Sequence, residues 1–226
     1  MVLEAKKADS EQARDALERL CSTYWFPLYA FVRRKGHSPH EAQDLVQGFF
    51  EQLLAKSYLE SVHPEKGKFR TFLLTALTNF LANDFDKKTR LKRGGGCQVI
   101  SINADEAEHR YLEEPADQVT SPDQAFDRAW AQTVFDTVLS KLHEEYRKTG
   151  DEARFNALQQ CLMAGDAQEK YVDIAPKLGL SEGGVKTSVR RMRLRFRDLL
   201  REELARTLAE GADLSEEIRH MIVALR

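Results

Sequence analysis

The chain has 226 residues, of which 42% are hydrophobic and 31% are charged, and its formal net charge is −2. This composition fits a soluble protein with one large or two small domains, and any strongly basic function must come from an uneven distribution of charge. No apolar run approaches the roughly 20 residues that a membrane span needs, and the N-terminus lacks the apolar stretch of a signal peptide. We therefore expect a cytoplasmic protein with no membrane partner.

The chain shows no pattern typical of metal-dependent or nucleophilic catalysis. The cysteines at 21, 97 and 161 form no CxxC pair, and the histidines show no HExxH spacing. The glycine-rich segment RGGGCQ lacks the lysine and the following helix of a phosphate-binding loop. We expect no metal, no cofactor and no enzymatic activity.

Helical periodicity dominates the first part of the chain. Residues 11–20 form one amphipathic segment, and Pro27 is expected to begin the next helix, since proline is best tolerated in a first turn. Gly36 is placed to end that helix. Ser38 and Glu41 then form a predicted capping box. The helix that they open has one apolar face, formed by Ala42, Leu45, Val46, Phe49, Phe50, Leu53 and Leu54.

Three polar residues, Asp44, Gln47 and Glu51, lie off this apolar face. On pattern alone they fit an ordinary solvated surface or a protein contact surface. A polar loop at 63–68 precedes the next predicted helix. The apolar face of that helix contains Phe69, Phe72, Leu73, Ala76, Leu77, Phe80 and Leu81.

The segment 66–93 is strongly basic, because its lysines and arginines outnumber Asp84 and Asp86. Cations interleaved with aromatic and amide side chains suit single-stranded DNA. The same pattern also fits a solvated helix face over a core of phenylalanines. Glycines 94–96 are expected to end the helix, because consecutive glycines carry a large backbone entropy in a helix.

The segment 104–127 is acidic, contains Pro115 and Pro122, and shows no helical periodicity, so it is expected to be a linker. Periodicity resumes near Asp123, with Phe126, Trp130, Val134, Val138 and Leu142 on one face. A short helix is expected at 215–225. The predicted fold is all-α, with two small helical domains at 1–96 and 123–201, an acidic linker at 97–122 and a helical extension at 202–226.

The segment 171–200 predicts a helix-turn-helix, with its turn at residues 179–181. Ser181 is a predicted N-cap. If Asp173 is the N-cap of the first helix, Pro176 falls in its first turn, and that helix is then very short or kinked. The second helix carries an apolar stripe of Val185, Val189 and Met192 and a cationic stripe of Lys186, Arg190, Arg193 and Arg197. This geometry is typical of a helix that enters the DNA major groove.

Two blocks of sequence carry a resemblance to a known family. GHSPHEAQDLVQGFFEQLL, followed by GKFRTFLLTALTNFLANDFDKKTR, resembles region 2 of bacterial sigma factors, and YVDIAPKLGLSEGGVKTSVRRMRLRFRDLL resembles their region 4. Together they resemble a divergent subgroup of the extracytoplasmic-function (ECF) sigma factors of the sigma-70 family. The resemblance implies a transcription initiation factor that binds core RNA polymerase and directs promoter recognition and opening. Promoter DNA is the second implied partner, and an anti-sigma factor or another regulatory protein is a third.

The resemblance also implies three sets of contact residues. Those for core polymerase are Asp44, Leu45, Gln47, Gly48 and Glu51. Those for the −10 promoter element are Lys66, Lys68, Arg70, Asn79, Asn83, Lys87, Lys88 and Arg90. Those for the −35 element are Ser181, Glu182, Lys186, Thr187, Arg190, Arg191 and Arg193.

Two other classes of protein stay open on the sequence. The first is a helix-turn-helix regulator that binds DNA without core polymerase, although such a regulator does not need the block that resembles region 2. The second is a sigma-like decoy that binds polymerase and opens no promoter. The extension after residue 201 has three interpretations: it packs on the second domain, forms a dimer, or regulates access to the contact surfaces.

Overall fold

The computed structural model describes residues 11–55, 69–88, 104–113, 121–162, 168–206, 208 and 213–225. These residues form α-helices and one short 3-10 helix, and no strand occurs among them, so the all-α prediction is confirmed. The expected loop at 63–68 and the glycines at 94–96 lie outside the described residues. The chain divides into two compact units. Unit 1 comprises Met1–Thr133 and Arg206–Arg226, and unit 2 comprises Val134–Ala205.

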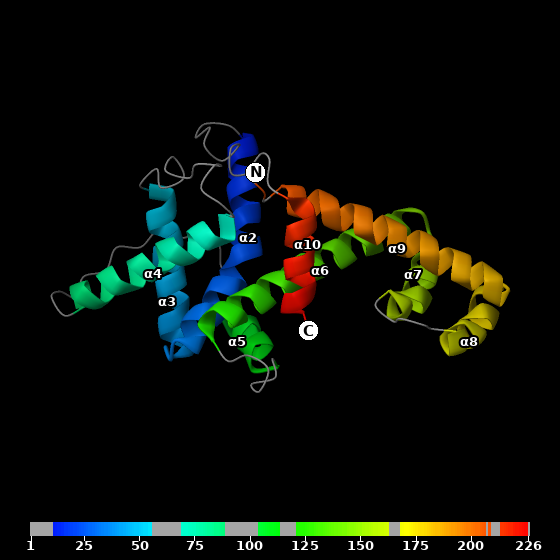
Figure 1. Ribbon diagram of the computed structural model, residues 1–226, viewed down its shortest axis with the longest axis horizontal. Coiled ribbons are helices and arrows are strands. Elements are labelled where there is room, and N and C mark those ends of the chain that lie inside the picture. Colours follow the sequence, from blue (N-terminus) through cyan, green and yellow to red (C-terminus); the bar gives the residue numbers. More distant parts are fainter. Residues whose placement is uncertain are drawn as a thin grey trace. The chain divides into compact units, whose positions relative to one another are not determined.

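Unit 2 is therefore inserted in the sequence between the two segments that build unit 1. The helices of unit 1 are α2 (Glu11–Arg34), α3 (Pro39–Ala55), α4 (Phe69–Lys88), α5 (Ala104–Glu113), the first part of α6 (Pro122–Lys148) and α10 (Leu214–Ala224) (Figure 1). The expected C-terminal helix is present as α10, and it belongs to the same unit as α2–α5.

Helix α2 is continuous through Pro27, so the expected helix start at this proline is wrong. Proline removes one backbone donor from a helix interior and crowds the preceding turn. Here that penalty is offset by burial on both sides of the proline, where Leu20, Tyr24 and Leu28 are at most 1% exposed. Gly36 has the positive φ of +95° that favours glycine, and its N–H donates to the Arg33 carbonyl at 3.0 Å. The predicted end of the helix at this glycine is confirmed.

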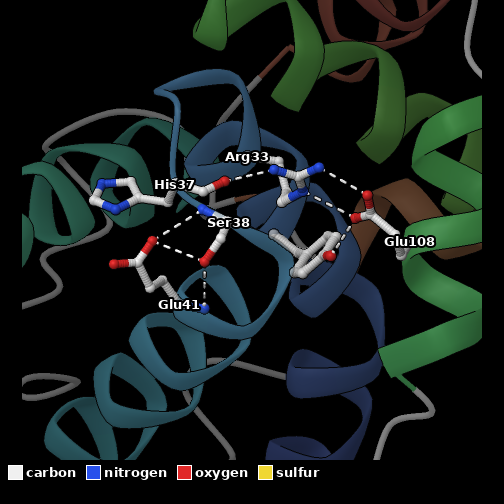
Figure 2. A network of polar contacts seen from close by, with 6 residues as sticks. Arg33, His37, Ser38, Glu41 and Glu108 are labelled. Carbon is white, nitrogen blue, oxygen red and sulfur yellow. Dashed lines mark hydrogen bonds and ion pairs between the residues drawn. The ribbon is translucent and has the colours of Figure 1, made fainter.

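The capping box predicted at the start of α3 is present (Figure 2). The Ser38 N–H donates to Glu41 Oε2 at 3.0 Å, and the Glu41 N–H donates to Ser38 Oγ at 3.4 Å. These bonds satisfy backbone donors that have no partner inside a helix. They fix where α3 begins, and with it the direction in which its polar face points.

An aromatic core joins the helices of unit 1. The ring of Tyr24 on α2 lies 5.5 Å from that of Phe69 on α4 and 6.5 Å from that of Phe126 on α6. Phe49 on α3 and Phe80 on α4 meet edge to face at 5.8 Å. Aromatic pairs at these separations add to the stabilisation that comes from buried area alone. The predicted apolar faces of α3 and α4 thus pack into a shared core.

Part of the segment that we expected to be an irregular linker is helix α5. The expectation is wrong for residues 104–113. Alanine and glutamate favour helix, but in this short segment only Ala107 is buried, at 5% exposed, so the apolar periodicity was too weak to recognise. Helix α5 packs on α2 and α3.

A half-buried carboxylate, that of Glu108, holds α5 against α2 (Figure 2). Glu108 accepts hydrogen bonds from Arg33 Nη2 at 2.7 Å and Nε at 2.9 Å, and from the Tyr29 hydroxyl at 2.6 Å. The hydrogen bonds from Arg33 lower the pKa of Glu108, and burial raises the pKa of Tyr29. A further Arg33 nitrogen donates to the His37 carbonyl, so one guanidinium ties α2 both to α5 and to the turn before α3.

Unit 2 contains the rest of α6, α7 (Glu152–Leu158), the 3-10 helix η4 (Gln159–Cys161), α8 (Gln168–Leu178) and α9 (Glu182–Ala205). Its core is formed by Val138, Leu142, Phe155, Leu158, Cys161, Leu162, Tyr171, Ile174, Ala175, Val185, Val189, Met192 and Leu199. This cluster includes the three residues of the apolar stripe predicted on the second helix of the helix-turn-helix.

Helix α8 begins at Gln168 and contains Pro176, so Asp173 lies inside the helix and is not its N-cap. Tyr171, Ile174 and Ala175 are at most 8% exposed. Their burial against α7 and α9 offsets the one backbone hydrogen bond that proline cannot donate.

Candidate nucleic-acid and polymerase interfaces

The turn between α8 and α9 has the hydrogen bonds that its sequence predicts. Gly179 ends α8 with a φ of +62°, and the Leu180 N–H donates back to the Ala175 carbonyl at 3.0 Å. Such bonds satisfy carbonyls at a helix C-terminus. Ser181 caps α9, because the Gly184 N–H donates to its Oγ at 3.2 Å. The turn thereby fixes two helices in sequence, with the N-terminus of α9 at the surface.

Helix α9 has two different faces near its N-terminus. Val185, Val189 and Met192 are at most 1% exposed and face the core of unit 2. Lys186 and Arg190 are exposed on the helix surface, one turn apart. The remaining predicted residues of this region, Ser181, Glu182, Thr187 and Arg191, are exposed as well. No ion pair occurs for Lys186, Arg190 or Arg191 among the residues that the structure describes, so their charges are directed to solvent.

Other arginines of α9 are engaged within unit 2. Arg193 donates from Nη2 and Nε to the Cys161 carbonyl, at 2.6 Å and 3.2 Å, which ties α9 to η4. Arg195 forms a two-point ion pair with Glu145 on α6, and these bonds lower the pKa of Glu145. Arg193 was expected among the DNA contacts, but its guanidinium instead holds the helix in place. Lys186, Arg190 and Arg191, the exposed cations among the expected −35 contacts, lie in the first three turns of α9.

The polar face predicted on α3 is present, although not all of its expected members lie on the surface. Asp44 is exposed, with its carboxylate 3.1 Å from His40 Nδ1, and Gln47 donates to Glu51 at 3.3 Å. Leu45 is 5% exposed and belongs to the core. A Cβ added to Gly48 would meet the ring of Phe80 on α4 at 3.5 Å, so Gly48 faces α4. The surface consists of Asp44, Gln47 and Glu51.

The residues expected on the −10 side lie in different environments. Asn79 and Asn83 are exposed on α4. Lys87 and Lys88 belong to the last turn of α4, but their side chains lie outside the described part of the chain. Lys66, Lys68 and Arg90 also lie outside the described residues. The structure thus gives this interface one exposed amide row on α4.

Arg70 is buried, which differs from the expected exposed DNA contact. Its residue is 6% exposed, and Nη1 donates to Asp127 Oδ1 on α6 at 2.8 Å. Its Nε lies 3.0 Å from Glu217 Oε1, and Nη2 donates to Glu217 Oε2 at 3.4 Å. Glu217 belongs to α10 and is itself 2% exposed. The guanidinium also lies over the Trp130 ring, 4.9 Å from its centroid.

The residues around Arg70 were not identified from the sequence. Asp127 was counted as one more charge of the acidic linker, and Glu217 as part of a tail. The one available signal is the spacing of Glu217 and Met221, which places both on the same helix face. A glutamate on an apolar helix face is seldom buried unless it is paired. Trp130 and His220 approach each other to 6.3 Å between ring centroids, and His220 Nε2 lies 3.0 Å from Asp127 Oδ2.

The residues that the structure describes contain no helix long and apolar enough to cross a membrane. Within the same residues, no group of histidine, cysteine, aspartate and glutamate side chains is arranged to hold a metal ion.

Comparison with known families finds a match for one segment of the chain. Residues 24–91 match the family model described as sigma-70 region 2, and this segment contains the C-terminal part of α2 and all of α3 and α4. This match shows that residues 24–91 are similar to region 2 of the sigma-70 family. No curated protein and no solved structure matches the chain. Asp127 and Glu217 lie outside the matched segment.

Proposed function

We propose that the protein is a sigma factor of the extracytoplasmic-function (ECF) kind, which binds core RNA polymerase and directs promoter recognition and opening in the cytoplasm. The observation that carries the proposal is the region 2 match over α2–α4, together with an exposed cationic helix in a second unit. A regulator that binds only DNA does not need a segment similar to sigma-70 region 2. Two separate modules on one chain suit a promoter with two elements, because tethering raises the effective concentration of the second contact.

In this proposal the α3 surface binds core polymerase. Asp44, Gln47 and Glu51 form an acidic and amide row with helical spacing on a rigid, capped helix. Leu45 and Gly48 lie behind this row, since Leu45 is buried in the core and Gly48 faces α4. The charge suits a basic docking surface, and the rigidity limits the entropy lost on binding.

The basic segment 66–93, which contains α4, binds the −10 element as a single strand. Asn79 and Asn83 offer amide groups to the edges of unstacked bases, while the cations at 66, 68, 87, 88 and 90 offer charge to phosphates. The start of α9 binds the −35 element as a duplex. Lys186 and Arg190 are placed for base edges or phosphates, and Ser181 with the N–H groups after it for a phosphate.

The test is co-purification of the full chain with core RNA polymerase, followed by transcription from a library of promoter fragments. We expect a stable complex and discrete start sites, with two shared sequence elements upstream of them. DNA binding without polymerase would show instead a helix-turn-helix regulator. Polymerase binding without any start site from the library would show a decoy, and either result would overturn the proposal.

A further inference from the structure

Arg70 on α4 is paired with carboxylates of α6 and α10. Arg70 lies inside the segment that matches sigma-70 region 2, yet both of its carboxylate partners come from outside that segment. Nη1 donates to Asp127 and Nη2 donates to Glu217, while Nε lies 3.0 Å from Glu217 Oε1 without the geometry of a hydrogen bond. The same donor fork pairs with phosphate oxygens in nucleic acid. The carboxylates thus occupy the groups with which Arg70 would bind a phosphate.

Helix α10 is held by a narrow set of contacts. It has 11 residues, and its buried side chains are Glu217 and Met221, which lie one turn apart. On its outer face Ile222 and Val223 are 49% and 67% exposed. A helix of this length is marginal alone in water, so its folding depends on docking to unit 1. The docked form of α10 is held by the Arg70–Glu217 ion pair, by the contacts of His220 with Asp127 and Trp130, and by packing of Met221.

We propose that α10 is an autoinhibitory latch. When α10 is docked, Glu217 and Asp127 hold Arg70 inside unit 1 and remove its charge from the basic segment that starts before α4. When α10 leaves, Arg70 loses Glu217 and the cover that α10 provides, so Nε and Nη2 are free to bind a phosphate in solvent. The latch rests on the proposed function in one respect, namely that this segment of unit 1 binds the promoter strand.

The first experiment measures binding of a fluorescein-labelled single-stranded DNA of about 20 nucleotides to the full chain, since ssDNA proteins bind about 4–16 nucleotides per module. Glu217→Gln removes the buried charge, and Glu216→Gln, on the exposed neighbour, is the matched control for net charge. We expect Glu217→Gln to bind about threefold tighter than Glu216→Gln, with a salt slope steeper by about 0.7, which is the contribution of roughly one phosphate contact. Adding Arg70→Gln to Glu217→Gln should abolish the gain.

A second variant releases the latch without changing charge. Met221→Ala weakens the docking of α10 through lost packing. Hydrogen exchange of residues 214–224 measures release directly, and circular dichroism confirms that the rest of the chain keeps its helices. We expect faster exchange in α10 for both Glu217→Gln and Met221→Ala, and tighter strand binding in step with it.

Three results would overturn the latch. Faster exchange of α10 with unchanged strand affinity would show that Arg70 is not withheld from DNA. Equal gains for Glu216→Gln and Glu217→Gln would assign the effect to net charge. Wild-type exchange in both release variants would show that α10 does not depend on the Arg70 contact. A chain that gains strand affinity on release and yet fails to bind core polymerase would support the latch and count against the proposed function alone.

Discussion

Arg70 in unit 1 lies in a different environment from Arg195 and Arg190 in unit 2. In unit 1 the Arg70 and Glu217 side chains are 7% and 3% exposed, whereas in unit 2 the paired Arg195 and Glu145 are 43% and 41% exposed, and Arg190 is exposed without an ion pair among the described residues. The segments 66–93 and 186–201, which contain these arginines, are about equally basic. The comparison teaches that the basic density of a segment does not locate a nucleic-acid surface, because exposure and partners decide which charges can act.

The largest expected effect is on the free energy of unfolding, when Arg70 is replaced, and Arg195 provides the comparison. Arg70→Gln removes the guanidinium that pairs with the buried Glu217 carboxylate, and we expect the free energy of unfolding to fall by about 3 kcal/mol or more. Arg195→Gln breaks a pair near the surface, and the expected loss is below about 1 kcal/mol. Urea unfolding followed by circular dichroism measures both. Equal losses for the two variants would contradict the difference in environment.

The next largest effect is on duplex DNA affinity, and it compares two positions on α9. We expect Arg190→Ala to weaken binding to a promoter duplex recovered by transcription by about 1–3 kcal/mol if it reads a base edge, and to lower the salt slope by about 0.9 if it binds a phosphate. Arg201→Ala, on an exposed position in a later turn of the same helix, is the matched control. Both variants should unfold within about 0.5 kcal/mol of the wild type. The same loss for both arginines would disprove a localised surface.

The acid sensitivity of unit 1 should depend on Glu108. Its pKa is lowered in the folded protein by hydrogen bonds from Arg33, so the ionised form stabilises the fold. This stabilisation is present above the ordinary value of 4.5 and is lost as the pH falls through the lower folded pKa. We expect Glu108→Gln to lower the unfolding free energy at neutral pH and to differ less from the wild type near about pH 3. A penalty that does not change with pH would contradict this role.

The smallest effect is expected at Gly183, near the start of α9. A Cβ there would meet only Ser181 Oγ, at 3.9 Å, so the fold does not require a glycine. Gly183→Ala should leave stability unchanged or raise it by about 0.5 kcal/mol, because alanine favours helix. If the glycine serves close approach of the backbone to DNA, duplex affinity should fall even so. Unchanged affinity would remove that interpretation, and thermal unfolding supplies the control.

Much of the fold could be predicted from local signals. Ser38 with Glu41, Gly36 and Ser181 each mark a helix boundary through a hydrogen bond or a φ angle that few other residues provide. The continuity of α2 and α8 through their prolines could not be predicted, because one lost hydrogen bond competes with tertiary packing that the sequence does not display.

The candidate sites divide in the same way. The exposure of Lys186 and Arg190 follows from helical spacing relative to Val185 and Val189, which are buried. The burial of Arg70 depends on carboxylates 57 and 147 positions away in the chain, and no local pattern connects them. Arg193 is a similar case, because its acceptor is a backbone carbonyl, which every residue possesses.

The most direct test of the central claim uses one variant from each unit in the same assay. Asp44→Lys, on α3, and Arg190→Ala, on α9, are both at exposed positions. We expect Asp44→Lys to abolish co-purification with core polymerase and to leave duplex binding intact, and Arg190→Ala to keep polymerase and lose promoter-dependent start sites. If Asp44→Lys retains polymerase and full transcription, or if Arg190→Ala initiates at every promoter as the wild type does, the division of labour between the two units is wrong.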